Sequence, residues 1–228
     1  MARSRKTAVS QYKPLFYALA FSNGVSLILF LMRSAESMTD RYWFLLWNIF
    51  LGWVPLLFAW VLVRRLKETR WSSWQNVGLT LLWLGFLPNS FYLVSDLIHL
   101  QQTGEVSMLY DAVMFMSFIF NGFVFGFMSL YIVHTALIRR SSTRVATQVV
   151  GLVLLACSFA IYMGRSLRWN TWDVLMRPLD IFIDVSDRVI YPTQHPHSFI
   201  TTTIFFLLLS STYAVIWTTI LAAKAQKK

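Results

Sequence analysis

Residues 86–100 read FLPNSFYLVSDLIHL and close a long apolar segment that begins near Trp74. Four polar side chains recur in this stretch at spacings of three, four and three residues. On a helix, which turns by about 100° per residue, these spacings place the four side chains within an arc of about 80°. A polar stripe on an otherwise apolar helix requires hydrogen-bonding partners from the rest of the chain. The stripe consists of Asn89, Tyr92, Asp96 and His99.

The composition of the chain is that of a membrane protein. Of its 228 residues, 57% are hydrophobic and only 13% are charged, whereas soluble domains carry about 25% charged residues. The mean hydropathy of +0.55 predicts that lipid surrounds much of the chain. The net charge of +10 does not indicate a nucleic-acid partner, because the basic residues lie between apolar segments rather than along one face. The only cysteine, Cys157, lies in an apolar run, so no disulfide can form within the chain.

Six apolar segments predict a single all-α transmembrane domain that covers residues 1–228. Each segment reaches or approaches the roughly 20 residues that a helix needs to cross the hydrocarbon core of a bilayer. Pro88 lies inside the third segment, where it removes a backbone donor and clashes with the preceding turn, so we expect this span to be kinked. The expected spans are residues 14–32, 42–63, 74–100, 111–138, 145–163 and 199–223.

The distribution of charge predicts how these spans are oriented. The N-terminal arm, residues 64–73, residues 139–144 and the C-terminal tail together hold 14 of the 20 basic residues. Because basic residues close to helix ends prefer the cytoplasm, we expect both termini on the cytoplasmic side, as an even number of spans requires. Nine of the ten acidic residues fall on the opposite side, so we expect the functional polarity at the extracytoplasmic face.

The longest connection between spans, residues 164–198, carries a helical pattern of its own. Asn170 and Asp173 resemble an N-terminal capping pair, because both side chains can accept hydrogen bonds from free N–H groups. After Asp173, charged residues gather on one side of a helical wheel and apolar residues on the other, which is typical of a helix in the membrane interface. We expect this amphipathic helix over residues 179–190, with Pro178 close to its start.

Asp96 and His99 are three residues apart and therefore share one face of a helix. Such a pair can bind a metal, or the carboxylate can orient the imidazole as a general base; alternatively, both residues simply end a helix in the headgroup region. The connection formed by residues 101–110 is short, so we expect Asp111 to lie close to the pair, although it can also cap the fourth span. A metal site can draw its ligands from Asp96, His99, His195 and His197.

Three further polar residues lie where membrane spans seldom place them. Asn121 falls near the middle of the fourth span, where an amide bonds a neighbouring helix or contacts a substrate. Arg165 and Arg168 follow the fifth span on the acidic side, against the usual bias of basic residues, so we expect a carboxylate or an anionic ligand beside them. If no anionic ligand binds, the two arginines can form structural salt bridges with Asp96, Asp111 or Asp173.

Two blocks of the sequence resemble a known family. Residues 83–100 read WLGFLPNSFYLVSDLIHL, and residues 164–173 read GRSLRWNTWD. In this order the blocks resemble the signature of the bacterial membrane proteins called domain of unknown function 1361, whose second block is a G-R-x-L-R-W-N-x-W-D run. The resemblance extends over roughly residues 40–220. It implies a multi-pass protein of the bacterial cytoplasmic membrane and indicates no particular activity.

Three functions are compatible with these patterns. The first is a partly enclosed polar site at the extracytoplasmic face that binds or acts on an amphiphilic or lipid-linked ligand. The second is a small transporter or channel component, and the third is a membrane scaffold without chemistry, which should expose Asp96 and Arg168 rather than enclose them. The sequence implies the lipid bilayer as a partner and leaves enzyme activity, cofactor and oligomeric state open. The residues expected at the site are Asn89, Tyr92, Asp96, His99, Asp111, Asn121, Arg165, Arg168, Asn170 and Asp173.

Overall fold

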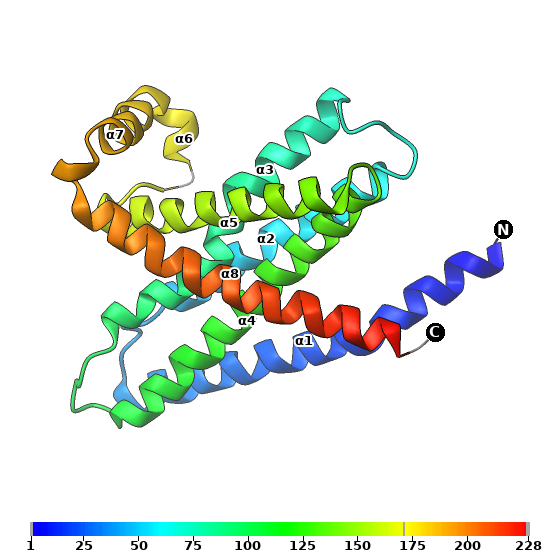
Figure 1. The fold of residues 1–228 in the computed structure, drawn as a ribbon. Helices are drawn as coiled ribbons and strands as arrows, with labels where there is room; N and C mark the ends of the chain where they lie inside the picture. Colours follow the sequence, from blue (N-terminus) through cyan, green and yellow to red (C-terminus); the bar gives the residue numbers. More distant parts are fainter. Residues whose placement is uncertain (1, 171, 227–228) are drawn as a thin grey trace.

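The computed structural model describes residues 2–170 and 172–226, with side chains for residues 17–170, 172–174 and 176–226. All regular secondary structure in these residues is helical (Figure 1). Six helices are long and apolar enough to cross a membrane, which confirms the all-α class and the six predicted spans. They are α1 (Ala2–Ser37), α2 (Phe44–Arg65), α3 (Trp74–Tyr92), α4 (Met108–Ile138), α5 (Thr143–Ser166) and α8 (Pro196–Ala225).

Helices α2, α3 and α4 form the centre of the bundle, with α1 against α4 and with α5 paired to α8 (Figure 1). The larger apolar cluster joins α2, α3, α4, α5 and α8 and includes Leu87, Phe91 and Phe127. A smaller cluster joins α1, α2 and α4 and includes Tyr42 and Phe115. The central three helices therefore set the framework, and α1 and α8 lie at its periphery.

Small residues allow the central helices to approach closely. A Cβ atom on Gly122 of α4 would lie 2.5 Å from the backbone oxygen of Ser90, and one on Gly126 would lie 2.6 Å from the ring of Phe91. Ser90 Oγ donates a hydrogen bond of 2.8 Å to the carbonyl oxygen of Gly52 in α2. Such close packing of small residues is typical of membrane helices. It brings α2 and α3 near enough for their polar side chains to meet.

The third span continues through Pro88. Helix α3 extends past the proline, and the chain then tightens into the 3₁₀-helix η1 (Leu93–His99). The span is thus continuous from Trp74 to the end of η1, and its helix type changes beyond the proline. Because side chains three residues apart eclipse one another in a 3₁₀-helix, Asp96 and His99 leave η1 in similar directions.

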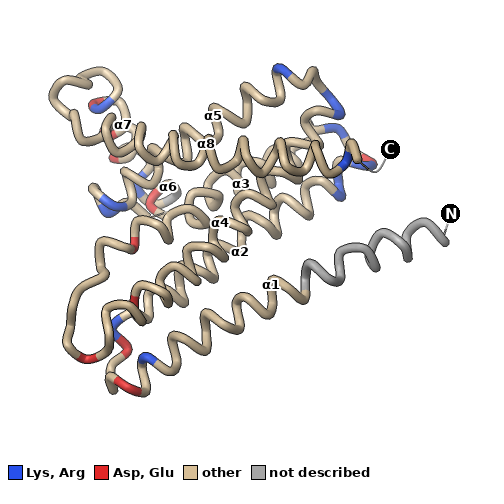
Figure 2. Tube along the Cα trace, turned by 60° about the horizontal axis from the view of Figure 1, so that its bottom comes forward, with Lys and Arg blue, Asp and Glu red and all other residues tan. Residues whose placement is uncertain are grey.

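The charged side chains divide between the two ends of the bundle (Figure 2). Lys and Arg gather where the α2–α3 and α4–α5 connections and the C-terminal end of α8 lie, and Glu68 is the only acid there among the described residues. We call this the basic end. The opposite end, where the other acids lie, is the acidic end. The assignment of the acidic end to the extracytoplasmic side stays a prediction.

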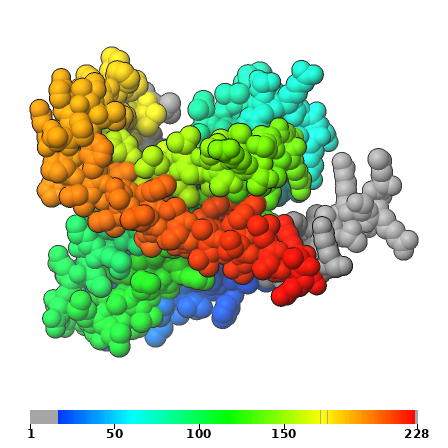
Figure 3. Space-filling view, viewed as in Figure 1, coloured from blue at the N-terminus to red at the C-terminus, as the bar shows by residue number. Residues whose placement is uncertain are grey.

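The connection between α5 and α8 folds at the acidic end into α6 (Asp173–Met176), α7 (Pro178–Ile190) and the 3₁₀-turn η2 (Pro192–Gln194). The predicted helix over residues 179–190 is confirmed, and it begins at Pro178, whose fixed φ suits a first helical turn. The α6–α7 segment forms a lobe at one corner of the molecule (Figure 3).

Helix α7 turns its charged side towards the bundle. Arg188 is buried and donates through Nε to the hydroxyl of Tyr162 in α5, at 3.3 Å. Asp184 accepts from the indole of Trp169 at 2.7 Å. Most apolar residues of the helix face outwards, as expected of a helix that lies in a membrane interface, while Ile181 and Val185 are partly buried on the bundle side. The exposed apolar residues are Leu179, Phe182, Ile183, Val189 and Ile190.

Candidate functional site

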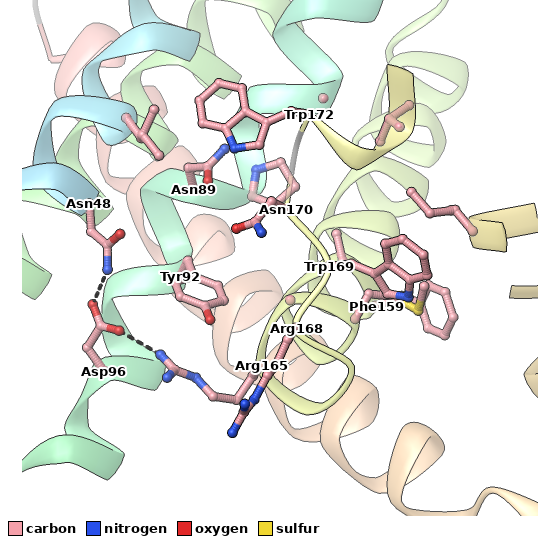
Figure 4. A pocket seen from close by; sticks show the side chains of 18 of the residues that line it. Asn48, Asn89, Tyr92, Asp96, Phe159, Arg165, Arg168, Trp169, Asn170 and Trp172 are labelled. Atoms are coloured by element: carbon pink, nitrogen blue, oxygen red, sulfur yellow. Dashed lines mark hydrogen bonds and ion pairs between the residues drawn. The ribbon is translucent and has the colours of Figure 1, made fainter. Parts of the chain in front are cut away.

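A partly open cavity of about 560 Å³ lies at the acidic end, between α2, the α3–η1 span, the end of α5 and the segment that leads into α7 (Figure 4). We call it the Asp96 cavity. Small-molecule sites in proteins typically occupy about 300–1,000 Å³. Much of the wall is aromatic, and polar side chains from α2, η1 and α5 complete it. The aromatic residues include Phe44, Trp47, Phe159, Trp169 and Trp172.

The carboxylate of Asp96 is the buried centre of the polar wall. The residue is only 1% exposed. Its Oδ2 accepts a hydrogen bond of 2.7 Å from Asn48 Nδ2 in α2, and its Oδ1 accepts one of 2.6 Å from Arg165 Nη2 at the end of α5 (Figure 4). Both carboxylate oxygens are therefore satisfied, one by a neutral amide and one by a cation. Three spans meet at this single residue.

The guanidinium of Arg165 is held by four hydrogen bonds and one stacking contact. Besides the Asp96 bond, Nε and Nη2 donate to Ser95 Oγ at 3.1 and 2.8 Å, and Nη1 lies 2.8 Å from His99 Nε2. The same group stacks over the Tyr92 ring, 4.6 Å from its centroid. These hydrogen bonds occupy four of the five N–H donors of the arginine. Arg165 is thus fixed against η1 and keeps little capacity for another partner.

The contact between Arg165 and His99 changes the expected chemistry of the Asp96–His99 pair. Arginine can only donate, so His99 Nε2 must accept and is unprotonated in this arrangement. The carboxylate of Asp96 is used by Asn48 and Arg165 rather than by the imidazole. Asp96 and His99 both contact Arg165 rather than each other, so this arrangement gives no support to the alternative in which Asp96 orients His99 as a general base.

Arg168 lines the same cavity, but its side chain is not held by the surrounding described residues. Its side chain is exposed and forms no hydrogen bond or ion pair with any described residue. It follows the C-cap of α5, Leu167, and its φ of 60° lies in the left-handed region. Glycine is the usual residue at this position after a helix, because a side chain there strains the backbone. The chain places a free guanidinium on that turn instead.

The structure brings together seven of the ten residues expected at the site. Asn170 lines the cavity, and Asp173 lies outside it, where its carboxylate accepts from the Asn170 N–H at 2.7 Å. This contact is one half of the predicted capping pair: the N-cap of α6 is Trp172, and no side chain caps it. The seven residues in the lining are Asn89, Tyr92, Asp96, His99, Arg165, Arg168 and Asn170.

Asp111 belongs to a second charged cluster and not to the Asp96 cavity, which corrects the expectation that it lies beside Asp96. It is buried on the side of α4 that faces α1, where Arg33 Nε lies 3.2 Å from its Oδ1. Arg33 also pairs with Glu105 at 3.0 Å and stacks over the Tyr42 ring. Burial raises the pKa of Tyr42, and the charge of Asp111 adds to this shift. The connection between α3 and α4 is short, but the rotation of α4 decides which neighbour Asp111 meets.

Asn121 likewise serves the contact between α4 and α1. Its Nδ2 donates to Ser26 Oγ at 2.9 Å, and its Oδ1 accepts from Asn23 Nδ2 at 3.3 Å. Of the two roles expected for this amide, the structure supports the hydrogen bond to a neighbouring helix. Asn121 does not line the Asp96 cavity.

The four residues proposed as metal ligands do not come together. His195 Nε2 lies 2.6 Å from Asp187 Oδ2 at the end of α7, and His197 is exposed near the start of α8. Asp96 and His99 lie in the cavity instead. Within the described residues, no group of three or more His, Cys, Asp or Glu side chains is placed to hold a metal ion.

Sequence reasoning missed Asn48 and Ser95, both of which contact the ion pair. A signal was present for Asn48, because it is the only amide in the apolar segment 42–63 and such a residue needs a partner in another helix. No comparable signal marks Ser95, since serine can satisfy its hydroxyl on its own helix.

Comparison with known proteins adds a family and no close relative. No curated protein and no solved structure matches the chain significantly. The family described as "Protein of unknown function (DUF1361)" matches residues 47–210, more than half of the chain. This range includes Asn48, Asp96, Arg165 and Arg168, and with them both blocks of sequence that build the Asp96 cavity. The chain belongs to the DUF1361 family.

Proposed function

We propose that this protein binds an amphiphilic molecule, a lipid or a lipid-linked compound, in the Asp96 cavity at the extracytoplasmic face of the membrane. The observation that carries the proposal is the joint presence of a polar wall, on which Arg168 is exposed, and an aromatic wall in one cavity of about 560 Å³. The polar wall suits a polar headgroup, and the aromatic wall suits an apolar chain.

The rim of the cavity supports this assignment. Trp47 is 44% exposed and Trp172 is 45% exposed, so both indole rings are available to a molecule that enters from the side. Tryptophan is enriched where membrane and water meet, because its ring is apolar and its N–H is polar. The volume fits a headgroup with the first part of a chain, and the remaining chain would lie in the surrounding lipid.

The charge distribution supports the extracytoplasmic side. The cavity lies at the acidic end, and the basic end carries the Lys and Arg residues that prefer the cytoplasm (Figure 2). The outward apolar side of α7 lies at the same end, where it would rest in the outer interface beside the cavity. A ligand would then reach the cavity from the outer leaflet.

The two rival functions have weaker support. A transporter path would use polar groups deep in the bundle, but Asn121 is engaged by α1. A scaffold should expose Asp96 and Arg168. Asp96 is buried, whereas Arg168 is exposed at the cavity. This arrangement is expected of a binding site in which Asp96 holds the helices together and Arg168 is accessible to a ligand.

The test is photo-crosslinking in native membranes with p-benzoylphenylalanine in place of Trp47. Trp60 is the matched control, because it lies on the same helix, is 45% exposed and does not line the cavity. We expect position 47 to give a discrete amphiphile adduct that Asp96→Asn depletes, and position 60 to give adducts that reflect the bulk lipid. Identical adducts in identical proportion at both positions would contradict the proposal.

A further inference from the structure

From the charge balance of the Asp96 cavity we infer that its ligand carries an anionic headgroup of the phosphate class, and that Arg168 binds this headgroup. The inference rests on the proposed function, because it names the ligand chemistry of the same cavity. It goes further in assigning a charge to the ligand and a binding role to one residue.

The first observation is the charge left over in the cavity. Two arginines line it, and Asp96 is the only carboxylate among the described residues of the lining. Asp96 is committed to Arg165 through the bond of 2.6 Å. The formal positive charge of Arg168 therefore has no counter-charge within the described lining.

The second observation concerns hydrogen-bond donors. Arg165 uses four of its five N–H groups on Ser95, Asp96 and His99. Arg168 uses none of its side-chain donors on any described residue. A free guanidinium presents a planar fork that matches two oxygens of a phosphate at once. Arg168 is thus the group with capacity for a ligand, and Arg165 shapes the wall behind it.

The third observation is that the nearby carboxylates are engaged elsewhere. Asp173 accepts from the Asn170 N–H, and Asp180 pairs with Arg177 at 3.0 Å. Asp184 accepts from the Trp169 indole and pairs with Arg188. The acids of α6 and the first half of α7 therefore leave Arg168 without an internal partner, even though they are close in sequence.

The fourth observation is the backbone at Arg168. Its left-handed φ of 60° strains any side chain, and glycine would adopt it without strain. A side chain on such a turn is tolerated where it does something that glycine cannot do. Here it carries the unpaired cation to the cavity. The strain also provides a sharp test, because Arg168→Gly removes the cation and relaxes the backbone together.

The experiment measures binding of lipids to the full-length purified protein in mild detergent, by native mass spectrometry and by thermal shift. The probes are phosphatidylglycerol, which is anionic, and phosphatidylcholine, which is zwitterionic. We expect phosphatidylglycerol to bind more tightly, and Arg168→Gly to weaken it by about tenfold or more, the loss expected when charge-assisted hydrogen bonds are removed. Arg168→Asn should act likewise, because asparagine tolerates the left-handed region and is neutral.

Arg144→Gln is the matched control, since Arg144 is likewise an exposed arginine without a hydrogen bond or ion pair to a described residue and does not line the cavity. It should leave phosphatidylglycerol binding unchanged. The unliganded Arg168→Gly protein should melt at the same temperature as the parent or higher. Inorganic phosphate, added as a competitor, distinguishes the sources: displacement of the lipid indicates a site for free phosphate as well, and no displacement indicates a lipid headgroup. Displacement supports the phosphate class, whereas loss of phosphatidylglycerol binding in Arg168→Gly without displacement by phosphate would restrict the inference to an anionic lipid headgroup.

Equal binding of the two lipids, unchanged by Arg168→Gly, would overturn the anionic headgroup and leave the proposed function intact. A fall in the melting temperature of unliganded Arg168→Gly, with both lipids lost in proportion, would show that Arg168 is only structural. Failure of both lipids to bind, together with no selective adduct at position 47, would overturn the proposed function itself.

Discussion

Arg165 Nη2 lies 2.6 Å from Asp96 Oδ1, and this ion pair joins the end of the fifth span to the end of the third. The Asp96 side chain is 2% exposed and the Arg165 side chain 20% exposed, so the pair lies between the protein interior and the cavity. Asn48 extends the contact to the second span. The same atoms therefore hold three helices together and form the polar wall of the Asp96 cavity.

Breaking this pair should destabilise the protein. Asp96→Asn leaves the Arg165 guanidinium without its counter-charge, and removal of one partner of a buried pair typically costs about 3 kcal/mol. We expect a lower melting temperature in detergent. The double change Asp96→Leu with Arg165→Met should recover much of the stability, because no charge then remains unpaired, while the crosslink at position 47 should stay absent. An unaltered melting temperature for Asp96→Asn would show that the pair does not stabilise the bundle.

The close approach of α4 to α3 gives a second prediction. Gly122→Ala places a Cβ atom 2.5 Å from the Ser90 backbone oxygen, and such overpacking costs about 1–3 kcal/mol. Gly151→Ala is the control, because a Cβ atom there meets nothing within 4 Å. We expect Gly122→Ala to lower the melting temperature and Gly151→Ala to leave it unchanged or raise it slightly. Equal effects would mean that α3 and α4 are not in close contact.

Glu105 makes the cluster at α1 sensitive to acid. Although burial acts to raise it, the hydrogen bonds and charges of Arg41 and Arg33 hold the pKa of Glu105 below its ordinary value of 4.5. A carboxyl group with a depressed pKa stabilises the fold above its unfolded pKa and loses that contribution as the pH falls through its folded pKa. Glu105→Gln should therefore lower the melting temperature at pH 7 and flatten its decline between about pH 5 and pH 3.

The control for this pH experiment is Glu68→Gln, since Glu68 forms no ion pair with a described residue. It should change neither the melting temperature at pH 7 nor its pH dependence. If the melting temperatures of Glu105→Gln and of the parent protein fell in parallel on acidification, Glu105 would not be a source of the acid sensitivity.

The outward side of α7 should be shielded by lipid. Single cysteines at Phe182 and Ile183, whose side chains are 69% and 63% exposed in the protein, should resist a membrane-impermeant maleimide in intact membranes. A cysteine at Asp180, on the charged side, should react. The native Cys157 is buried and is replaced by alanine for this experiment. Uniform labelling of all three positions would place α7 in water.

The orientation of the bundle is tested with reporter fusions. Fusions after residues 68, 142 and 228 should report the cytoplasm, and a fusion near residue 105 should report the outside. A cytoplasmic signal at residue 105 would invert the bundle and move the Asp96 cavity to the cytoplasmic face.

The sequence alone determined six apolar helices long enough to cross a membrane and the helix at residues 179–190. These features depend on apolar runs and on local periodicity, which act within a few turns of one helix. It also determined that Asn89, Tyr92, Asp96 and His99 face one way, because the stripe is a property of a single span.

Only the tertiary structure decided which helix each polar residue meets. Asp96 and Asp111 are similar in type and placement, yet one pairs with Arg165 and the other with Arg33. The choice depends on how α4 is rotated, and close contacts far along the chain, such as Gly122 against Ser90, set that rotation. The partnership of Asn48 with Asp96 depends on the same packing, because two helices must approach before their side chains can bond. The physical reason is that local sequence sets helical faces, whereas long-range packing determines which faces meet.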